Sequence, residues 1–212
     1  MLTQSQIKWL ATAIMVIDHV GLIWNLEPLQ IIGRLSFPMF AWVFAQNWKR
    51  PGEKKALIKR LIGFGLLSHV PYILAFWRLE GNIMLTFTIA AVCFGYIRKS
   101  TENKRILILA LGLIGAEFSG TGYGWYGVAC PLLMLSLKEQ GSRMWWIGWI
   151  VTNIIYATTS GSFIQLFAIL TPVVLAYHNP EKDRQPTAIE KKFFYYFYPI
   201  HLAGLAALRT IV

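Results

Sequence analysis

Apolar segments long enough to cross a lipid bilayer recur along this chain, and they constrain its fold more than any other feature. A transmembrane helix needs about 20 mainly apolar residues, and only helices or closed barrels satisfy their own backbone hydrogen bonds inside a bilayer. Hydrophobic residues make up 56% of the sequence and charged residues only 14%. We therefore predict an all-α fold, a polytopic transmembrane helical bundle that forms one domain over residues 1–212.

The apolar pattern predicts about nine spans. Their expected bounds are 7–24, 31–48, 57–77, 83–97, 106–118, 124–137, 144–158, 162–178 and 193–211. The fifth and sixth segments are short, and 106–118 is also compatible with a re-entrant or tilted element. Without these two segments the bundle has seven spans, and both counts stay open. The first segment has no small-residue cleavage site, so we expect it to be retained rather than removed as a signal peptide.

The net charge of +10 follows the expected topology rather than a nucleic-acid partner. The Lys and Arg residues gather in alternate connections, and all except Arg34, Arg78 and Arg209 fall on one side of the expected bundle. Cytoplasmic loops carry an excess of basic residues. We therefore predict a cytoplasmic N-terminus, a multi-pass protein of the cell membrane and no binding of nucleic acid.

Asp18 and His19 lie side by side inside the first apolar segment. Ionisable groups at membrane depth are costly, so they usually face a protein interior or a water-filled cavity. Neighbouring residues of a helix point about 100° apart, so an acid–base dyad between these two is not expected. We expect Asp18 to pair with Arg34 of the next segment, which leaves His19 to point into a cavity.

Other histidines fall at a similar depth in the expected bundle. At about 1.5 Å per residue, His19 and His69 lie about 18 Å from the cytoplasmic end of their spans and His201 about 12 Å. His178 lies at the cytoplasmic boundary. A buried histidine can instead serve only as a hydrogen-bonding group between helices, and for His69 the two interpretations are equally weighted.

The two cysteines, Cys93 and Cys130, lie in separate apolar segments. They have neither the spacing of a metal site nor that of a disulfide framework. We therefore interpret them as small packing residues and expect no metal.

Six short motifs follow one another along nearly the whole chain. They are IDHVG at 17–21, GRLSFPMF at 33–40, KRL at 59–61, NIMLT at 82–86, YGWYG at 123–127 and FYYFYPIHL at 194–202. In this order they resemble the TraX family of membrane proteins, known for N-terminal acetylation of conjugative pilin. The family often has Asp where this chain has Gly122, and Glu117 is a carboxylate that the sequence offers nearby.

The resemblance implies a function as well as a fold. The TraX family is similar in outline to membrane acyltransferases of the acyltransferase-3 type, which take acyl groups from cytosolic acyl-CoA and rely on a histidine in the first helix. It implies acetyl-CoA as co-substrate and a bacterial inner, or cytoplasmic, membrane. By resemblance the catalytic residues are His19, Asp18, Arg34 and His201. The expected substrate- or donor-binding residues are His69, Asn82, Tyr123, Tyr198, Lys54, Lys55, Lys59 and Arg60.

Acyl transfer from a thioester needs a base for the acceptor, donors for the developing oxyanion and a means of holding both substrates. His19 suits the first role, and Arg34, Asn82 or Tyr123 the second. The basic residues near position 55 suit the phosphates of coenzyme A, although ordinary positive-inside charge explains any one of them equally well. We expect a peptide N-terminal amine or a glycan as the acceptor, reached from the outer side. A proton-coupled transporter and a non-catalytic membrane assembly factor are the alternatives.

Overall fold

The computed structural model describes residues 1–136 and 142–211, and the regular structure within these ranges is helical. Residue 137, where the sixth span was expected to end, and Lys138, which was counted among the cytoplasmic charges, lie outside the described residues. The chain divides into two compact units, each built from two stretches. Unit 1 comprises Met1–Lys49 and Cys130–Thr187, and unit 2 comprises Arg50–Ala129 and Ala188–Val212.

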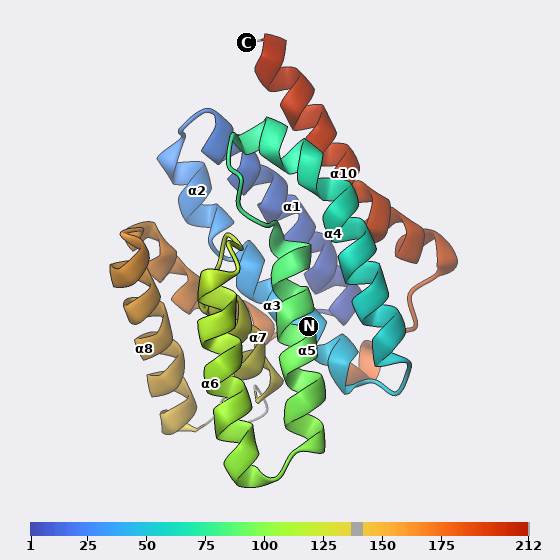
Figure 1. Ribbon diagram of the computed structural model, residues 1–212. Coiled ribbons are helices and arrows are strands. Elements are labelled where there is room, and N and C mark those ends of the chain that lie inside the picture. Colours follow the sequence, from blue (N-terminus) through green and yellow to red (C-terminus); the bar gives the residue numbers. More distant parts are fainter. Residues whose placement is uncertain (137–141, 212) are drawn as a thin grey trace. The chain divides into compact units, whose positions relative to one another are not determined.

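Unit 1 begins with three helices, and the second and third both pack against the first. Its helices are α1 (Gln4–Ile23), α2 (Glu27–Gly33), α3 (Ser36–Lys49), α8 (Arg143–Ser160), the 3₁₀ helix η2 (Phe163–Leu170), α9 (Thr171–Leu175), the short η3 (Pro180–Lys182) and the end of α7. The first helix packs against both α2 and α3, while α8 packs against η2 (Figure 1). The indole Nε1 of Trp149 donates to the Ile169 carbonyl at 3.2 Å and fixes this second contact.

Unit 2 contains a layer of long helices. They are α4 (Lys54–Phe76), α5 (Ile83–Lys99), α6 (Glu102–Phe118), the start of α7 (Tyr126–Leu135) and α10 (Ala188–Ile211). Figure 1 shows α10 running along α4, and α5 forming a hairpin with α6. Near the end of α10 the Arg209 guanidinium lies 4.3 Å from the centre of the Trp77 ring. It also donates to the Ala75 carbonyl at 2.7 Å, so it closes the C-terminal end of α4.

Two expected spans are not single α-helices. The segment 31–48 is divided between α2 and α3 at Arg34 and Leu35. Pro38 explains the break, because it has no N–H to donate to the carbonyl four residues earlier and is tolerated only in the first turn of a helix. The segment 162–178 consists of η2 followed by the five-residue α9. Here Pro172 lies at the start of α9 for the same reason.

The other expected spans correspond to helices of different lengths. The segment 106–118 belongs to the continuous 17-residue α6, and both interpretations of it, a full span and a re-entrant or tilted element, stay open. By contrast α7 has only 10 residues, fewer than a full crossing needs. Of the described residues, α1 and α4 are the helices long and apolar enough to cross a membrane by length and composition. Cys93 and Cys130 are both buried, as expected of packing residues.

Candidate functional site

In unit 1, α1 and α2 form a tight hairpin that brings Asp18 and Arg34 together. The chain reverses between Ile23 and Glu27, and Asn25 adopts the left-handed backbone conformation with φ +53°. The Arg34 guanidinium pairs with the Asp18 carboxylate, with only 12% and 9% of the two side chains exposed. The expected pairing of Asp18 with Arg34 is therefore confirmed.

Gln30 orients Arg34 for this contact. The backbone carbonyl of Gln30 accepts a hydrogen bond from Arg34 Nε at 3.1 Å. The Gln30 side chain in turn donates to the carbonyl of Gly21 on α1 at 3.0 Å. The guanidinium is thus held from two directions, by its own helix and by the carboxylate across the hairpin. A charge held in this way needs little reorganisation when a neighbouring charge develops.

Two glycines allow the helices of the hairpin to approach this closely. A Cβ atom on Gly21 would lie 2.9 Å from both the backbone nitrogen of Gln30 and the Cβ atom of Leu29. On Gly33 a Cβ atom would collide with the Asp18 side chain. The small residues are therefore required for the ion pair itself, because any side chain at position 33 occupies the space of the Asp18 carboxylate.

Replacing Gly33 by alanine is expected to destabilise unit 1 by about 1–3 kcal/mol, the usual cost of forcing an extra methyl group into a packed site. Denaturant unfolding in detergent measures the change. Gly204→Ala is the matched control, because a Cβ atom on Gly204 meets nothing within 4 Å. Equal stability of the two variants would contradict the close contact at Gly33.

His19 follows Asp18 on α1, and the structure places its side chain at intermediate exposure. Its neighbour Asp18 is directed to Arg34, and adjacent helical residues point about 100° apart. The geometry agrees with separate roles for the two residues. The catalytic role of His19 stays a prediction.

In unit 2, His201 and Tyr198 lie on α10 within one helical turn. The Nδ1 atom of His201 is 3.1 Å from the Phe197 carbonyl, and the imidazole stacks on the Phe197 ring with centroids 4.9 Å apart. Tyr198 is buried, and the Ile83 backbone and the phenols of Tyr72 and Tyr123 lie within electrostatic reach of its hydroxyl. Two residues predicted to bind substrate, Tyr123 and Tyr198, thus belong to one group of phenols.

Asn82 joins α5 to α4. Its side-chain oxygen accepts from the Met84 backbone at 3.1 Å and so caps α5, while its amide donates to the Gly65 carbonyl at 2.8 Å. The amide oxygen and the amide nitrogen of Asn82 therefore both hold helices in place. The sequence had suggested that this side chain donates a hydrogen bond to the oxyanion. Nearby on α4, two buried atoms have no hydrogen-bond partner among the described residues, namely Ser68 Oγ and His69 Nδ1.

Two carboxylates, Glu80 and Glu117, lie near the point where the loops after α4 and α6 meet. Gly81 donates to the Gly120 carbonyl at 2.7 Å and accepts from Gly122 at 2.9 Å, which joins the two loops. Glu117, which the sequence offered near Gly122, instead accepts from the Trp125 backbone at 3.1 Å and lies against Gly124.

The carboxylate nearest Gly122 belongs to Glu80, which sequence reasoning missed. A Cβ atom on Gly122 would lie 2.9 Å from Glu80 Oε2 and 3.5 Å from the Tyr72 hydroxyl. Only the pairing of the two loops shows this proximity, because the two residues are far apart in sequence. In the sequence, the only indication of this contact was the presence of glycines at positions 81, 120, 122 and 124.

The four basic residues expected to bind coenzyme A stand in the first two turns of α4. Lys54 Nζ donates to the Arg50 carbonyl at 2.6 Å, and Arg98 of α5 repels Lys54 electrostatically. The Arg60 guanidinium lies 5.7 Å from the centre of the Tyr195 ring of α10. Lys55 and Lys59, four residues apart on the same helical face, are exposed.

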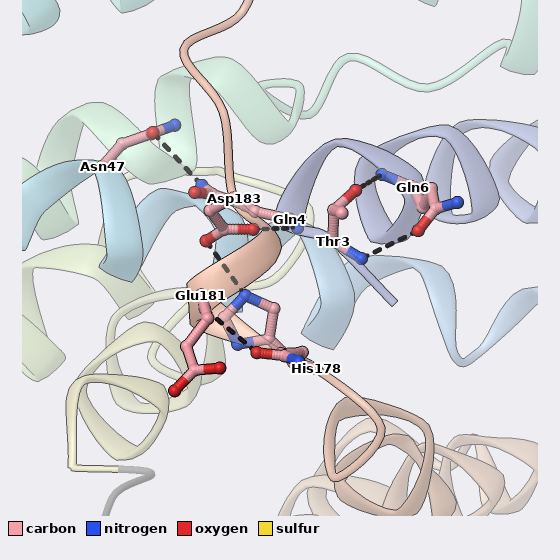
Figure 2. Close-up of polar contacts among 8 residues, drawn as sticks. Thr3, Gln4, Gln6, Asn47, His178, Glu181 and Asp183 are labelled. Carbon is pink, nitrogen blue, oxygen red and sulfur yellow. Dashed lines mark hydrogen bonds and ion pairs between the residues drawn. The ribbon is translucent and has the colours of Figure 1, made fainter. Parts of the chain in front are cut away.

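Unit 1 holds a further polar cluster at the start of α1, drawn in Figure 2. One oxygen of Asp183 accepts from the Gln4 backbone at 2.7 Å, and the other lies 3.0 Å from His178 Nε2. The Gln4 side chain donates to Asn47 at 3.3 Å, and Thr3 caps α1 through a reciprocal contact with Gln6. Sequence reasoning placed His178 at the membrane boundary and gave it no partner. The cluster fastens the loop after α9 to the first helix.

The residues predicted to form one site therefore lie in both units. Unit 1 contains Asp18, His19 and Arg34, and unit 2 contains the remainder. They are His69, Asn82, Tyr123, Tyr198, His201, Lys54, Lys55, Lys59 and Arg60. The structure brings together Asp18 with Arg34, and Tyr123 with Tyr198.

These features define the class of protein: a helical protein that has apolar helices of membrane length and ionisable side chains buried within them. The TraX protein family matches residues 3–209, and the chain belongs to the TraX family. This confirms the resemblance that the ordered motifs indicated.

Individual relatives extend over most of the chain. A protein TraX of Escherichia coli is 29% identical over 215 residues, which cover 95% of this chain and 85% of the relative. A protein TraX of Escherichia coli strain K12 is 32% identical over 138 residues, 63% of this chain and 54% of the relative. The probable fimbrial assembly protein FimC, serogroup H1, of Dichelobacter nodosus is 23% identical over 247 residues, 98% and 96% of the two chains. No solved structure matches the chain.

Proposed function

We propose that this protein is a membrane-embedded acetyltransferase, which moves an acetyl group from cytosolic acetyl-CoA to a peptide N-terminal amine or another membrane-accessible acceptor such as a glycan. The observation that carries the proposal is the ion pair between Asp18, which lies next to His19 on the apolar helix α1, and Arg34 at the end of α2. Buried charges of this kind are costly and usually functional. Membership of the TraX family supports the same reaction class.

A multi-pass arrangement in the bacterial inner membrane accompanies this proposal. Besides α1 and α4, α8 exposes an apolar stripe with helical spacing. The stripe consists of Ile147, Ile150, Val151, Ile154 and Ile155. Contiguous exposed apolar surfaces of this kind mark contact with a membrane or a partner. An exposed apolar face of this kind supports further spans, up to about the nine that the hydropathy pattern predicts.

The proposed chemistry begins with the acceptor amine. An α-amino group has an unperturbed pKa of about 7.7–8.0, so part of it is neutral at physiological pH. Its nitrogen attacks the thioester carbonyl, and His19 accepts the proton that the amine loses. The C–S bond then breaks, and the thiol of coenzyme A leaves with a proton. Arg34, fixed by Asp18 and Gln30, stabilises the negative charge that develops on the carbonyl oxygen.

The direct test is transfer by the purified protein. Protein in detergent is incubated with acetyl-CoA labelled in its acetyl group and with peptides that have a free N-terminus. We expect label in the peptides, and none in the same peptides when they are already N-acetylated. Absence of transfer to any free-amine peptide or glycan, with acetyl-CoA bound, would contradict the proposed activity.

The basic end of α4 should determine affinity for the donor. Because each charged hydrogen bond contributes about 1.5–3 kcal/mol, replacing both Lys55 and Lys59 by glutamine is expected to weaken acetyl-CoA binding about tenfold or more. Thermal stabilisation by the ligand measures the affinity.

Acetyl-pantetheine, which lacks the nucleotide phosphates, provides the ligand control and should bind the variant and the parent equally. Lys104→Gln on α6 provides the matched protein control, because it removes an exposed charge from a different helix. An equal loss of affinity in this control would assign the effect to general surface charge rather than to a phosphate site.

A non-catalytic assembly factor is the second candidate, because the Dichelobacter relative is named as a probable fimbrial assembly protein. A proton-coupled transporter remains the alternative that buried acids and imidazoles suggest. Neither alternative requires acetyl-CoA. Stabilisation by acetyl-CoA that exceeds the stabilisation by free adenine nucleotides therefore favours the acetyltransferase over both.

A further inference from the structure

Glu80 and Tyr72 converge on one small region of unit 2, at Gly122. Measured from the place where a Cβ atom of Gly122 would stand, Glu80 Oε2 is 2.9 Å away and the Tyr72 hydroxyl 3.5 Å away. The glycine therefore leaves room for the carboxylate and the phenol to approach each other, and the two groups interact electrostatically. Two further phenols extend the polar region, since Tyr198 interacts with both Tyr72 and Tyr123.

A buried hydroxyl without a partner lies on the same face of α4. Ser68 precedes Tyr72 by four residues, so the two side chains share one helical face. Ser68 is fully buried, and its Oγ makes no hydrogen bond among the described residues. Buried polar groups in folded proteins nearly always have a partner, so an orphaned one calls for an explanation such as a bound ligand. One α4 face thus carries both an orphaned hydroxyl and the phenol that meets Glu80.

The Glu80 carboxylate makes a weak, solvent-exposed ion pair within the protein. Its ion pair with Arg78 has an N–O distance of 3.5 Å, and 58% of the Arg78 side chain and 36% of the Glu80 side chain are exposed. Surface ion pairs of this kind contribute little to stability. A cationic ligand can therefore displace the guanidinium at small cost. Aromatic rings can add to the binding of an ammonium group when the cation lies over the ring face.

The two ends of α4 carry different charges, and these charges suit two different substrates, the donor and the acceptor. The helix has its basic residues in the first two turns, and Glu80 follows its other end. Its 23 residues correspond to about 35 Å. The first end suits an anionic donor. At the second end, which also has Arg78 and Arg209, the Glu80 carboxylate is the group that suits a cationic acceptor. The region between them contains Ser68, His69 and Tyr72.

We infer that Glu80 and Tyr72, at Gly122, bind the ammonium group of the acceptor. This inference rests on the proposed function for the identity of the cation, an acceptor amine. The carboxylate binds the charged amine, which gives one proton to water before its neutral nitrogen attacks the thioester, and Tyr72 contributes a hydroxyl and a ring. Gly122 acts as a positioning residue, because its missing side chain leaves space for Glu80. The site thereby selects amines over hydroxyl acceptors.

The test compares alanyl-leucinamide, which has a free ammonium group, with its N-acetylated form. Thermal stabilisation of the full-length protein in detergent reports binding without acetyl-CoA. We expect Glu80→Gln, which preserves shape, to weaken binding of the free-amine peptide about tenfold or more, the usual effect of removing a charged hydrogen bond. Under turnover conditions the KM for this peptide should rise similarly, while the KM for acetyl-CoA stays unchanged.

Two glycine variants and one arginine variant test whether Glu80 itself binds the ammonium group. Gly122→Ala should reproduce the loss, because the added Cβ atom displaces the Glu80 carboxylate. Gly115→Ala on α6 should leave binding unchanged, since its Cβ atom meets nothing within 4 Å. Arg78→Gln should leave ammonium binding unchanged or tighter, because it removes the cation that competes for Glu80.

The outcomes separate this inference from the proposed function. Ammonium binding that is lost in Glu80→Gln, in a protein that never transfers acetyl groups, would support the cation site and contradict the acetyltransferase. Transfer with an unchanged peptide KM in Glu80→Gln would overturn the cation site and leave the acetyltransferase intact. Equal binding of the free-amine and N-acetylated peptides would overturn the cation site as well.

Discussion

Replacing Arg34 by glutamine is expected to lower the free energy of unfolding by about 3–5 kcal/mol, the usual cost of removing one partner of a buried ion pair. The carboxylate of Asp18 would remain in the hairpin of α1 and α2 with its charge uncompensated. Denaturant unfolding in detergent measures the loss, and transfer of labelled acetyl groups measures activity.

A double variant separates the structural contribution of the pair from a catalytic one. Asp18→Leu combined with Arg34→Met replaces both charges with apolar side chains of similar size, a change that is often neutral for stability. If Arg34 stabilises the developing oxyanion, the double variant should be stable but at least about 100-fold slower, the typical effect of losing an oxyanion donor. Full activity in the stable double variant would show that the pair only holds the hairpin together.

The same ion pair shows how far sequence reasoning extends. Asp18 and Arg34 belong to consecutive apolar segments, and both lie toward the outer side of the expected bundle, so their contact followed from depth and connectivity. The break of the helix at Arg34 was not expected, although Pro38 marks it. A hydropathy window averages over such a proline, because the flanking residues are equally apolar on both sides.

Contacts that depend on the conformation of loops could not be predicted from depth and connectivity. Glu80 reaches Gly122 only because Gly81 exchanges backbone hydrogen bonds with Gly120 and Gly122. Backbone bonds between loops have no side-chain periodicity, so no pattern in the sequence reports them. The Asp183 contact with the start of α1 joins residues at opposite ends of unit 1 for the same reason.

The role of Asn82 shows a second reason why sequence alone did not predict the site. Its place in a motif suggested a substrate contact, but its position directly before an apolar helix is equally typical of an N-cap. The structure shows the cap together with a second bond to Gly65. Sequence position alone cannot distinguish a polar side chain that binds substrate from one that fixes two helices.

Replacing His19 by alanine is expected to reduce acetyl transfer by about 10²- to 10⁴-fold, the usual contribution of a general base. Binding of acetyl-CoA should be unchanged, because His19 is proposed to act on the acceptor amine, whereas the basic residues of α4 are proposed to bind the phosphates of the donor. Initial rates with labelled acetyl-CoA measure the first quantity and thermal stabilisation the second.

His178→Gln is the matched loss of an imidazole in the same unit. Its contact with Asp183 supports the loop after α9, so this variant should lose stability but retain the transfer rate of the folded protein. Raising the pH should partly restore transfer by His19→Ala, because a larger fraction of the acceptor amine is then neutral without help from a base. Undiminished transfer by His19→Ala at neutral pH would remove His19 from the mechanism. An equal loss in His178→Gln would attribute the effect to the folding of unit 1 rather than to proton transfer.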